Sequence, residues 1–311
     1  MVEDNQIKAK VSPFAIRKGE IKTFDGKDGY VSMNQIVHKI NVGHITDIHF
    51  AILELVNEFE FITSRQLLQM LKIKGFEEQA QDKLNNKLES LVKSKILTRY
   101  YFNSDEGKGI YRIYCLEKMG KYLLNSKEID CKWQPSDNTK PVAMIKKRLA
   151  GNQTLIAYLR KVKAFDSYVV KPALTAKVSA KIFKASGGSV KLTKNKKSIQ
   201  FLFEAIRREN EWPKKLVDKM RLYKEFYENF VPGDSGFSTM PQLIFICEDE
   251  KHMAETFKEI IKNELEIPQI KLYFTTDLRQ NEETLENTLV DFKLVDGKYK
   301  MENVELKLLG M

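Results

Sequence analysis

The order of hydrophobic patterns over residues 45–125 constrains the fold of this chain more than any other feature. Apolar residues recur at helical spacing in three successive stretches, which end near Glu58, Leu71 and Lys93. Two β-like runs follow, joined by a polar segment, and a fourth helical stretch ends near Asn125. Three helices, a β-hairpin and a further helix are the elements of a winged helix-turn-helix. We therefore predict such a domain over residues 44–130.

The third helical stretch, residues 77–93, has an apolar side and a polar side. Ala80, Leu84, Leu88, Leu91 and Val92 form the apolar stripe that we expect to be buried. Side-chain amides pair with adenine in the major groove and Lys donates to guanine, so the polar side suits base recognition. The predicted DNA contacts on this helix are Gln79, Gln81, Lys83, Asn86 and Lys87. The alternative is a winged helix that contacts proteins, with these residues forming only a solvated face.

Further predicted DNA contacts flank this helix. Ser64 and Arg65 begin the second helix, with Thr63 or Ser64 as its cap, and helix N-termini favour anions. Arg99 and Arg112 lie on the β-like runs 96–102 and 110–116, and Lys108 lies in the polar segment 103–109. We expect these cations to meet phosphates or the minor groove. The expected partner is double-stranded DNA.

The rest of the chain predicts one further domain. Residues 1–43 resemble an arm with one short helix near 31–40, and the Pro-, Ser- and Asp-rich segment 131–141 marks a linker. Residues 142–311 begin with a helix and continue with short β-like runs, which alternate with helices over 243–274 in the α/β manner. Asp296-Gly297 predicts a late hairpin. The expected fold class is α+β or α/β, with a winged helix followed by an α/β domain.

The net charge of +10 is unevenly distributed along the chain. Residues 131–231 hold 23 Lys and Arg against 8 Asp and Glu, whereas residues 232–311 hold 9 against 16. A segment this basic attracts a polyanion, and counterion release makes nucleic acid the leading candidate. A solvated Lys-rich surface, or pairing with the acidic C-terminal part, would explain the same count. The predicted phosphate contacts here are Lys191, Lys194, Lys196 and Lys197, on a hairpin.

Residues 198–230 combine a buried strand carrying Glu204, a turn, and a helix carrying Lys215, Lys219 and Tyr223. Together with the predicted winged helix and the later strand 241–247, this pattern resembles the replication-relaxation family of plasmid proteins from Gram-positive bacteria, over residues 44–275. The resemblance implies a winged helix fused to an α/β domain related to the PD-(D/E)xK nuclease fold. It also implies that Glu204 holds the first position of a Glu-x-Asp strand, with Lys219 and Tyr223 on the following helix.

Ile206 stands where that family pattern has its second acid, and the hairpin 189–197 offers lysines in place of an Asp. Metal-dependent cleavage of DNA needs at least two acidic ligands. We therefore expect a degenerate site with no catalytic residue, metal or cofactor, in which Glu204 is salt-bridged to Arg207, Lys215 or Lys219. The expected domain role is binding or assembly.

The expected function is sequence-specific, non-catalytic binding of double-stranded DNA by a protein of a plasmid or other mobile element. Replication, conjugative transfer and transcriptional control are the processes it would serve. One alternative is a metal-dependent nuclease or nickase. Another is an assembly protein whose α/β domain recruits a partner or forms a homodimer, with DNA contact secondary.

The compartment is expected to be the cytoplasm. No apolar run approaches the roughly 20 residues that cross a bilayer, and the N-terminal residues contain no apolar signal core. The cysteines, Cys115, Cys131 and Cys247, are odd in number and far apart, as in proteins of a reducing cytosol. We expect no contact with a membrane.

Overall fold

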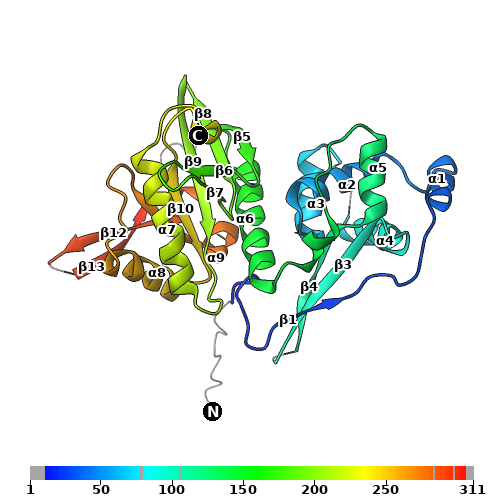
Figure 1. The fold of residues 1–311 in the computed structure, drawn as a ribbon, viewed down its shortest axis with the longest axis horizontal. Coiled ribbons are helices and arrows are strands. Elements are labelled where there is room, and N and C mark those ends of the chain that lie inside the picture. The colour runs from blue at the N-terminus through cyan, green and yellow to red at the C-terminus, as the bar shows by residue number, and fades with distance from the viewer. Residues whose placement is uncertain (1–10, 77–79, 106, 283, 297, 306–311) are drawn as a thin grey trace, which may run out of the picture.

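Two mixed units joined by the long helix α6 (Val142–Lys161) make up the fold of this computed structural model (Figure 1). The structure describes residues 11–76, 80–105, 107–282, 284–296 and 298–305. The chain is therefore of the α+β class, as the sequence predicts, and its larger sheet is mixed. In the described part of the chain no helix is both long and apolar enough to span a bilayer.

The first unit packs helices against a small antiparallel sheet of order β1-β3-β4-β2. Its α3 begins with a capping box, in which the Thr63 hydroxyl accepts from the Gln66 amide N–H at 3.2 Å and the Gln66 side chain accepts from the Thr63 N–H at 3.1 Å. The predicted cap at Thr63 is confirmed. In chain order the elements are α2 (Asp47–Phe59), β2 (Ile62–Thr63), α3 (Ser64–Ile73), α4 (Gln81–Lys93), β3 (Leu97–Ser104), β4 (Gly107–Leu116) and α5 (Lys118–Ser126).

The N-terminal segment is built into both units. Its helix α1 (Met33–Asn41) confirms the helix predicted near 31–40, whereas β1 (Ile21–Phe24) was not predicted and pairs with the edge of β3. Earlier in the segment, the Ile16 N–H donates to Glu248 of the second unit at 3.0 Å. The described part of the arm therefore bridges the two units.

The second unit is a seven-stranded sheet of order β13-β12-β11-β10-β9-β8-β5. Its parallel strands are β9 (Lys197–Ala205), β10 (Gln242–Cys247) and β11 (Leu272–Thr276). The antiparallel strands are β5 (Phe165–Val169), β8 (Ser189–Lys194), β12 (Leu289–Val295) and β13 (Lys298–Val304). The late hairpin predicted around Asp296 is confirmed by the pairing of β12 with β13.

Helices cover both faces of this sheet. Alternate residues of β9 point to opposite sides, so that Phe201 and Phe203 join the core shared with α6 and Leu202 joins the core beneath α7 (Trp212–Glu228) and α8 (Glu250–Lys262). The remaining elements are the small hairpin of β6 (Ala173–Ala176) and β7 (Lys181–Lys184), the helix α9 (Asp277–Glu282), and 3-10 turns at Pro135–Thr139, Asp234–Gly236 and Leu285–Asn287.

Helix α6 fixes the first unit to the second because it is buried on several sides. Its apolar residues, Leu149 and Tyr158 among them, belong to one core that runs from the first unit to the large sheet. Its polar groups are bonded across the junction: the Gln66 amide donates to the Leu149 carbonyl at 2.8 Å, and the Asn152 amide donates to the Phe61 carbonyl at 2.8 Å. The two units therefore share one continuous core.

Three sequence predictions differ from the structure. The third helix begins at Gln81, and Ala80 is its exposed, extended N-cap, so Ala80 does not belong to the buried stripe. The hairpin tip is shorter than the predicted 103–109, because Asn103 pairs with Lys108 and Ser104 with Gly107. The short elements β6 and α9 were not predicted, since neither has enough residues to establish a period.

Candidate nucleic-acid interface

The exposed face of α4 is mainly polar. Leu84, Leu88, Leu91 and Val92 are buried as predicted, while Asp82, Lys83, Asn85 and Asn86 are exposed. Lys87 is half-buried beside His49, whose pKa is lowered by burial first and by Lys87 second. At 100° per residue, Lys83, Asn86 and Lys87 share one half of the helix surface. Gln81 lies on the opposite side of the helix from Lys83, where its side-chain amide donates to Asn85 at 3.1 Å.

A groove runs along the side of α4 that carries Gln81. Ser64 and Arg65 at the start of α3, Gln81 on α4 and Arg112 on β4 all line it, and its volume is about 840 Å³. Residues of the second unit, Gln153 on α6 and Asn281 on α9 among them, form the opposite wall. The structure thus brings four of the predicted contact residues into one groove. Lys83, Asn86 and Lys87 do not line it.

The two hairpin arginines are held by acidic residues. Arg99 is only 9% exposed; its Nε lies 2.9 Å from an Asp25 carboxylate oxygen, and its Nη1 is bonded to Glu89. The bond from Arg99 holds the pKa of Glu89 below its ordinary value. Arg112 is exposed, and its Nε lies 3.0 Å from the same oxygen of Asp25. Arg99 therefore positions the hairpin instead of facing solvent.

Gln79 and the side chain of Lys108 lie outside the described residues. Two further residues at this surface, Asn85 and Asp25, were not predicted from the sequence. Asn85 follows Gln81 by one helical turn, a spacing that would have identified it. No local pattern marks Asp25, because its arginine partners are more than 70 residues away along the chain.

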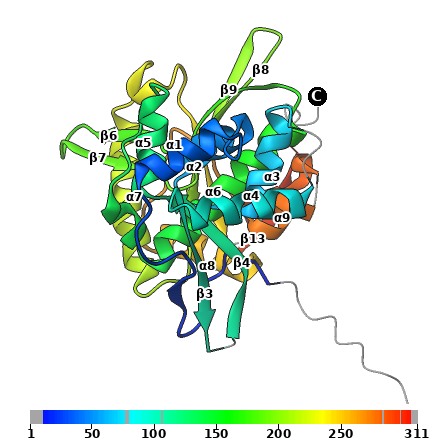
Figure 2. The same cartoon turned by 90° about the vertical axis from the view of Figure 1, so that its right-hand side faces the viewer.

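The predicted phosphate-binding lysines of β8 and β9 lie elsewhere. Lys191 is bonded to Asp166 at 3.1 Å, Lys194 is partly buried, and Lys196 and Lys197 are exposed at the tip. Asn195 and Lys196 both have positive φ, which gives the tight turn of a two-residue hairpin. This hairpin and the β3–β4 hairpin project from opposite ends of the molecule (Figures 1 and 2). The structure therefore does not gather all the predicted lysines on one surface.

Glu204 is buried at 4% exposure and fully engaged by donors. It accepts hydrogen bonds from the Tyr223 hydroxyl at 2.6 Å, the Ser186 hydroxyl at 2.8 Å and the Ser186 N–H at 3.1 Å. Lys219 lies 3.8 Å away, which confirms one of the three predicted ion pairs. Burial and the Glu204 charge raise the pKa of Tyr223 well above its ordinary value, so its hydroxyl remains a donor.

The other two predicted partners of Glu204 pair elsewhere. Arg207 binds Asp277 at 2.8 Å, and Lys215 binds Glu209 at 2.6 Å. Among the described residues there is no group of three or more His, Cys, Asp or Glu side chains placed to hold a metal ion. The donors around Glu204 thus occupy it with hydrogen bonds and one ammonium group.

Comparisons with known proteins identify no relative: the chain matches no protein-family model, no curated protein and no solved structure. The likeness to plasmid replication-relaxation proteins therefore remains a prediction from the sequence pattern.

Proposed function

We propose that this protein binds double-stranded DNA sequence-specifically and without cleaving it, and that its first unit acts as a winged helix-turn-helix. The observation that carries the proposal is the polar, solvent-facing side of α4, a helix whose Glu89 bonds Arg99 of the long β3–β4 hairpin. The pairing of β2 with β4 fixes the start of α3 beside that hairpin. A third helix exposed in this way fits the major groove, with the hairpin along the adjacent backbone.

In this arrangement the residues divide by role. Lys83 and Asn86 reach base edges from the exposed side of α4, and Lys87 supports them from its flank. Arg65 is exposed at the N-terminal end of α3, where the helix dipole and free N–H groups favour phosphate. Arg112 contributes a further cation once it leaves Asp25.

The second unit supports the non-catalytic part of the proposal. In chain order its elements are α6, β5, the β6–β7 hairpin, β8, β9, α7 and β10, so the strand that carries Glu204 is followed by the helix that carries Lys219 and Tyr223, as in the sequence pattern. Glu204 is bonded by Tyr223 and Ser186 and has Lys219 beside it, which disfavours a divalent cation at that carboxylate. We propose that this unit serves binding or assembly in plasmid replication, transfer or transcriptional control.

Selection of binding sites from a random duplex library with the full-length protein tests the proposal. We expect enrichment of a defined sequence, bound at least about a thousandfold more tightly than random duplex at physiological salt. Incubation of supercoiled DNA with Mg²⁺ or Mn²⁺ should leave it intact. Failure to enrich any sequence would contradict sequence-specific binding. Metal-dependent nicking that Glu204→Ala abolishes would establish the nuclease alternative instead.

A further inference from the structure

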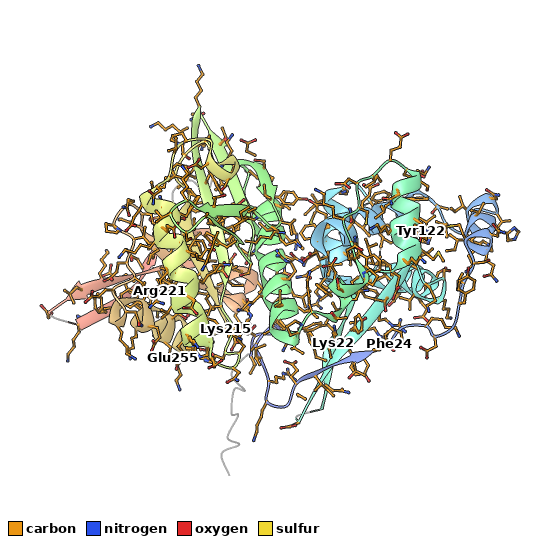
Figure 3. The ribbon with its side chains drawn as sticks, viewed as in Figure 1. Lys22, Phe24, Tyr122, Lys215, Arg221 and Glu255 are labelled. Atoms are coloured by element: carbon orange, nitrogen blue, oxygen red, sulfur yellow. The ribbon has the colours of Figure 1, made fainter. Side chains whose placement is uncertain are left out.

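A basic cleft of about 500 Å³ lies where the two units meet, separate from the α4 surface. Its wall includes Glu60 and Phe61 of the first unit, side chains of α6, and residues of the second unit from Lys171 to Lys219. Eight Lys and Arg side chains line it against three Glu side chains. Lys215, labelled in Figure 3, contributes from the start of α7. The cleft therefore carries excess positive charge inside a concave site.

Two acids beside the cleft neutralise part of its charge: Asp277 pairs with Arg207 at 2.8 Å, and Asp137 pairs with Lys140 at 3.0 Å. The carboxylates that line the cleft are shared among several of the remaining cations, so the cleft keeps an excess of positive charge. Glu60 lies 3.2 Å from Lys140 and 3.6 Å from Arg148, and it also contacts Lys171. Glu209 is shared by Lys147 and Lys215.

Lys184 adds a further charge at the rim. Its side chain is exposed, and within the described part of the chain its ammonium group makes no ion pair or hydrogen bond, although Asp137 is near enough for Lys184 to help lower the pKa of that carboxyl. An anion that entered the cleft would meet Lys184 and Lys171 together, because the two lysines are close enough for Lys184 to lower the pKa of Lys171.

Burial makes this arrangement costly when the cleft is empty of anions. Desolvation, assisted by Lys184, lowers the pKa of Lys171 to about 8. Desolvation also lowers the pKa of Arg148 to about 10, although its guanidinium donates to the Val170 carbonyl at 2.7 Å. Cations crowded together and partly withdrawn from water are stabilised by an anion placed between them.

The remaining wall of the cleft is apolar. Phe61, Met144, Trp212 and Leu216 line it, and Met144 is 52% exposed. Trp212 is half-buried and packs edge-on against His252. A flat ring can pack on such a surface while an attached anion reaches the lysines. The volume lies within the roughly 300–1,000 Å³ of ordinary ligand sites.

We propose that this cleft binds a nucleotide, with its phosphate held by Lys171, Lys184 and the neighbouring cations and its base packed against Met144 and Trp212. Ser186 and Glu204 also line the cleft, and the Ser186 hydroxyl donates to Glu204. A free mononucleotide and the 5′-terminal nucleotide of a DNA strand present this same chemistry. The site is distinct from the proposed duplex-binding surface, so each can fail without the other.

Isothermal titration calorimetry of the full-length protein at low salt, without metal ions, tests the proposal. The probes are inorganic phosphate, dAMP, and a short single-stranded oligonucleotide with and without a 5′-phosphate. We expect dAMP or the 5′-phosphorylated strand to bind more tightly than inorganic phosphate and the unphosphorylated strand. Tighter binding of dAMP identifies a free nucleotide as the ligand, and tighter binding of the phosphorylated strand identifies a strand end.

The double variant Lys171→Ala/Lys184→Ala should weaken that binding about ten- to a hundredfold. The matched control Lys258→Ala/Lys271→Ala removes the same charge from exposed positions of the second unit that do not line the cleft, and it should leave the binding unchanged. Lys184→Gln alone, at a side chain without a described partner, provides a variant that keeps the fold if the double variant unfolds.

Three results would overturn the proposal. One is the absence of binding by every probe at millimolar concentration. Another is an equal loss of affinity in the cleft variant and the control variant, which would indicate non-specific attraction. The third is equal affinity for inorganic phosphate and dAMP, because the apolar wall would then contribute nothing. Retention of nucleotide binding by an α4 variant that no longer binds duplex DNA would show that the two sites are independent.

Discussion

The α4 face and the basic cleft both carry lysines, but they differ in how charge is arranged. On α4, Lys83 and Lys87 are mixed with Asn86 and Asp82, and the adjacent hairpin arginines are tied to Asp25. In the cleft, cations outnumber carboxylates by eight to three. Hydrogen-bonding groups spread over a helix face can distinguish one base from another, whereas concentrated charge holds phosphate without regard to sequence. We therefore propose that the α4 face provides sequence specificity and that the cleft provides strong attraction for anions.

The total charge of the chain does not reveal this separation. Residues 1–130, which contain α4, hold 20 Lys and Arg against 18 Asp and Glu. The basic segment 131–231 contributes the linker, α6 and most of the cleft wall instead. The charge count predicts a polyanionic partner, but the fold decides which surface meets it.

The largest expected effect follows from removing the polar groups of α4. Lys83→Ala, Asn86→Ala and Lys87→Ala together should weaken binding to the selected duplex more than a hundredfold, since each base contact contributes roughly 1–3 kcal/mol. Fluorescence anisotropy with labelled duplex measures the loss. The control Lys118→Ala/Asn125→Ala/Lys127→Ala makes the same chemical changes on α5 and at its C-cap residue, Lys127, and should bind normally. Full affinity in a folded α4 variant would show that another surface reads the DNA.

Glu204→Ala should lower the free energy of unfolding by about 3 kcal/mol, because it leaves the buried Tyr223 hydroxyl and the Ser186 N–H without their acceptor. Urea denaturation followed by circular dichroism measures this. Glu228→Gln, at an exposed position on the same helix as Tyr223, serves as the control and should change little. Duplex affinity should stay near that of the wild type. A large loss of duplex affinity without loss of stability would place Glu204 in the binding site.

The sequence was sufficient to locate a helix where a helical period of apolar residues or an N-cap residue defines it. The Leu84/Leu88/Leu91 stripe located α4, and the Thr63 cap located the start of α3. It was insufficient where distant segments meet. Glu60, Arg148 and Lys171 converge only after α6 packs between the units. The pair of Glu204 with Lys219 was partly predictable from the sequence, because the two residues lie on a strand and on the helix that follows it.

Asp25→Asn should make the charge of the α4 region more like that of the basic cleft, because it removes the carboxylate that holds the hairpin arginines beside α4. Asp25 contacts both Arg99 and Arg112, and Arg112 is the exposed one of the two. We expect duplex affinity to rise several-fold at low salt, with the slope of log affinity against log salt steeper by about one. Asp28→Asn, an exposed position in the same turn-rich segment, should leave affinity and slope unchanged. An unchanged slope for Asp25→Asn would show that Arg112 makes no phosphate contact.

The smallest expected effect is a pH dependence that belongs to the cleft alone. The pKa of Lys171 is about 8, whereas the second pKa of a phosphate monoester is near 6. Between pH 7 and pH 9 the phosphate stays dianionic while Lys171 loses its proton, so dAMP affinity should fall about three- to tenfold.

Folding stability should change in the opposite direction over the higher part of this range. A lysine whose pKa is lowered in the folded state destabilises that state while it is charged. This penalty is present below about pH 8 and is relieved as the pH rises from about 8 towards 10.5. Because the folded state becomes more stable as the pH rises, unfolding would not explain a fall in dAMP affinity.

Lys171→Arg isolates the responsible group, because the guanidinium stays charged throughout this range. Other charged groups around Lys171, among them Glu60, Asp137, Lys140, Arg148 and Lys184, are unchanged in this variant. Its affinity for dAMP should be nearly constant from pH 7 to pH 9, whereas Lys196→Arg at the distant hairpin tip should keep the wild-type fall. Duplex binding by α4 should not weaken between pH 7 and pH 9 in the wild type or in either variant. Identical pH profiles for Lys171→Arg and the wild type would exclude Lys171 as the titrating residue and with it the assignment of the phosphate to this end of the cleft.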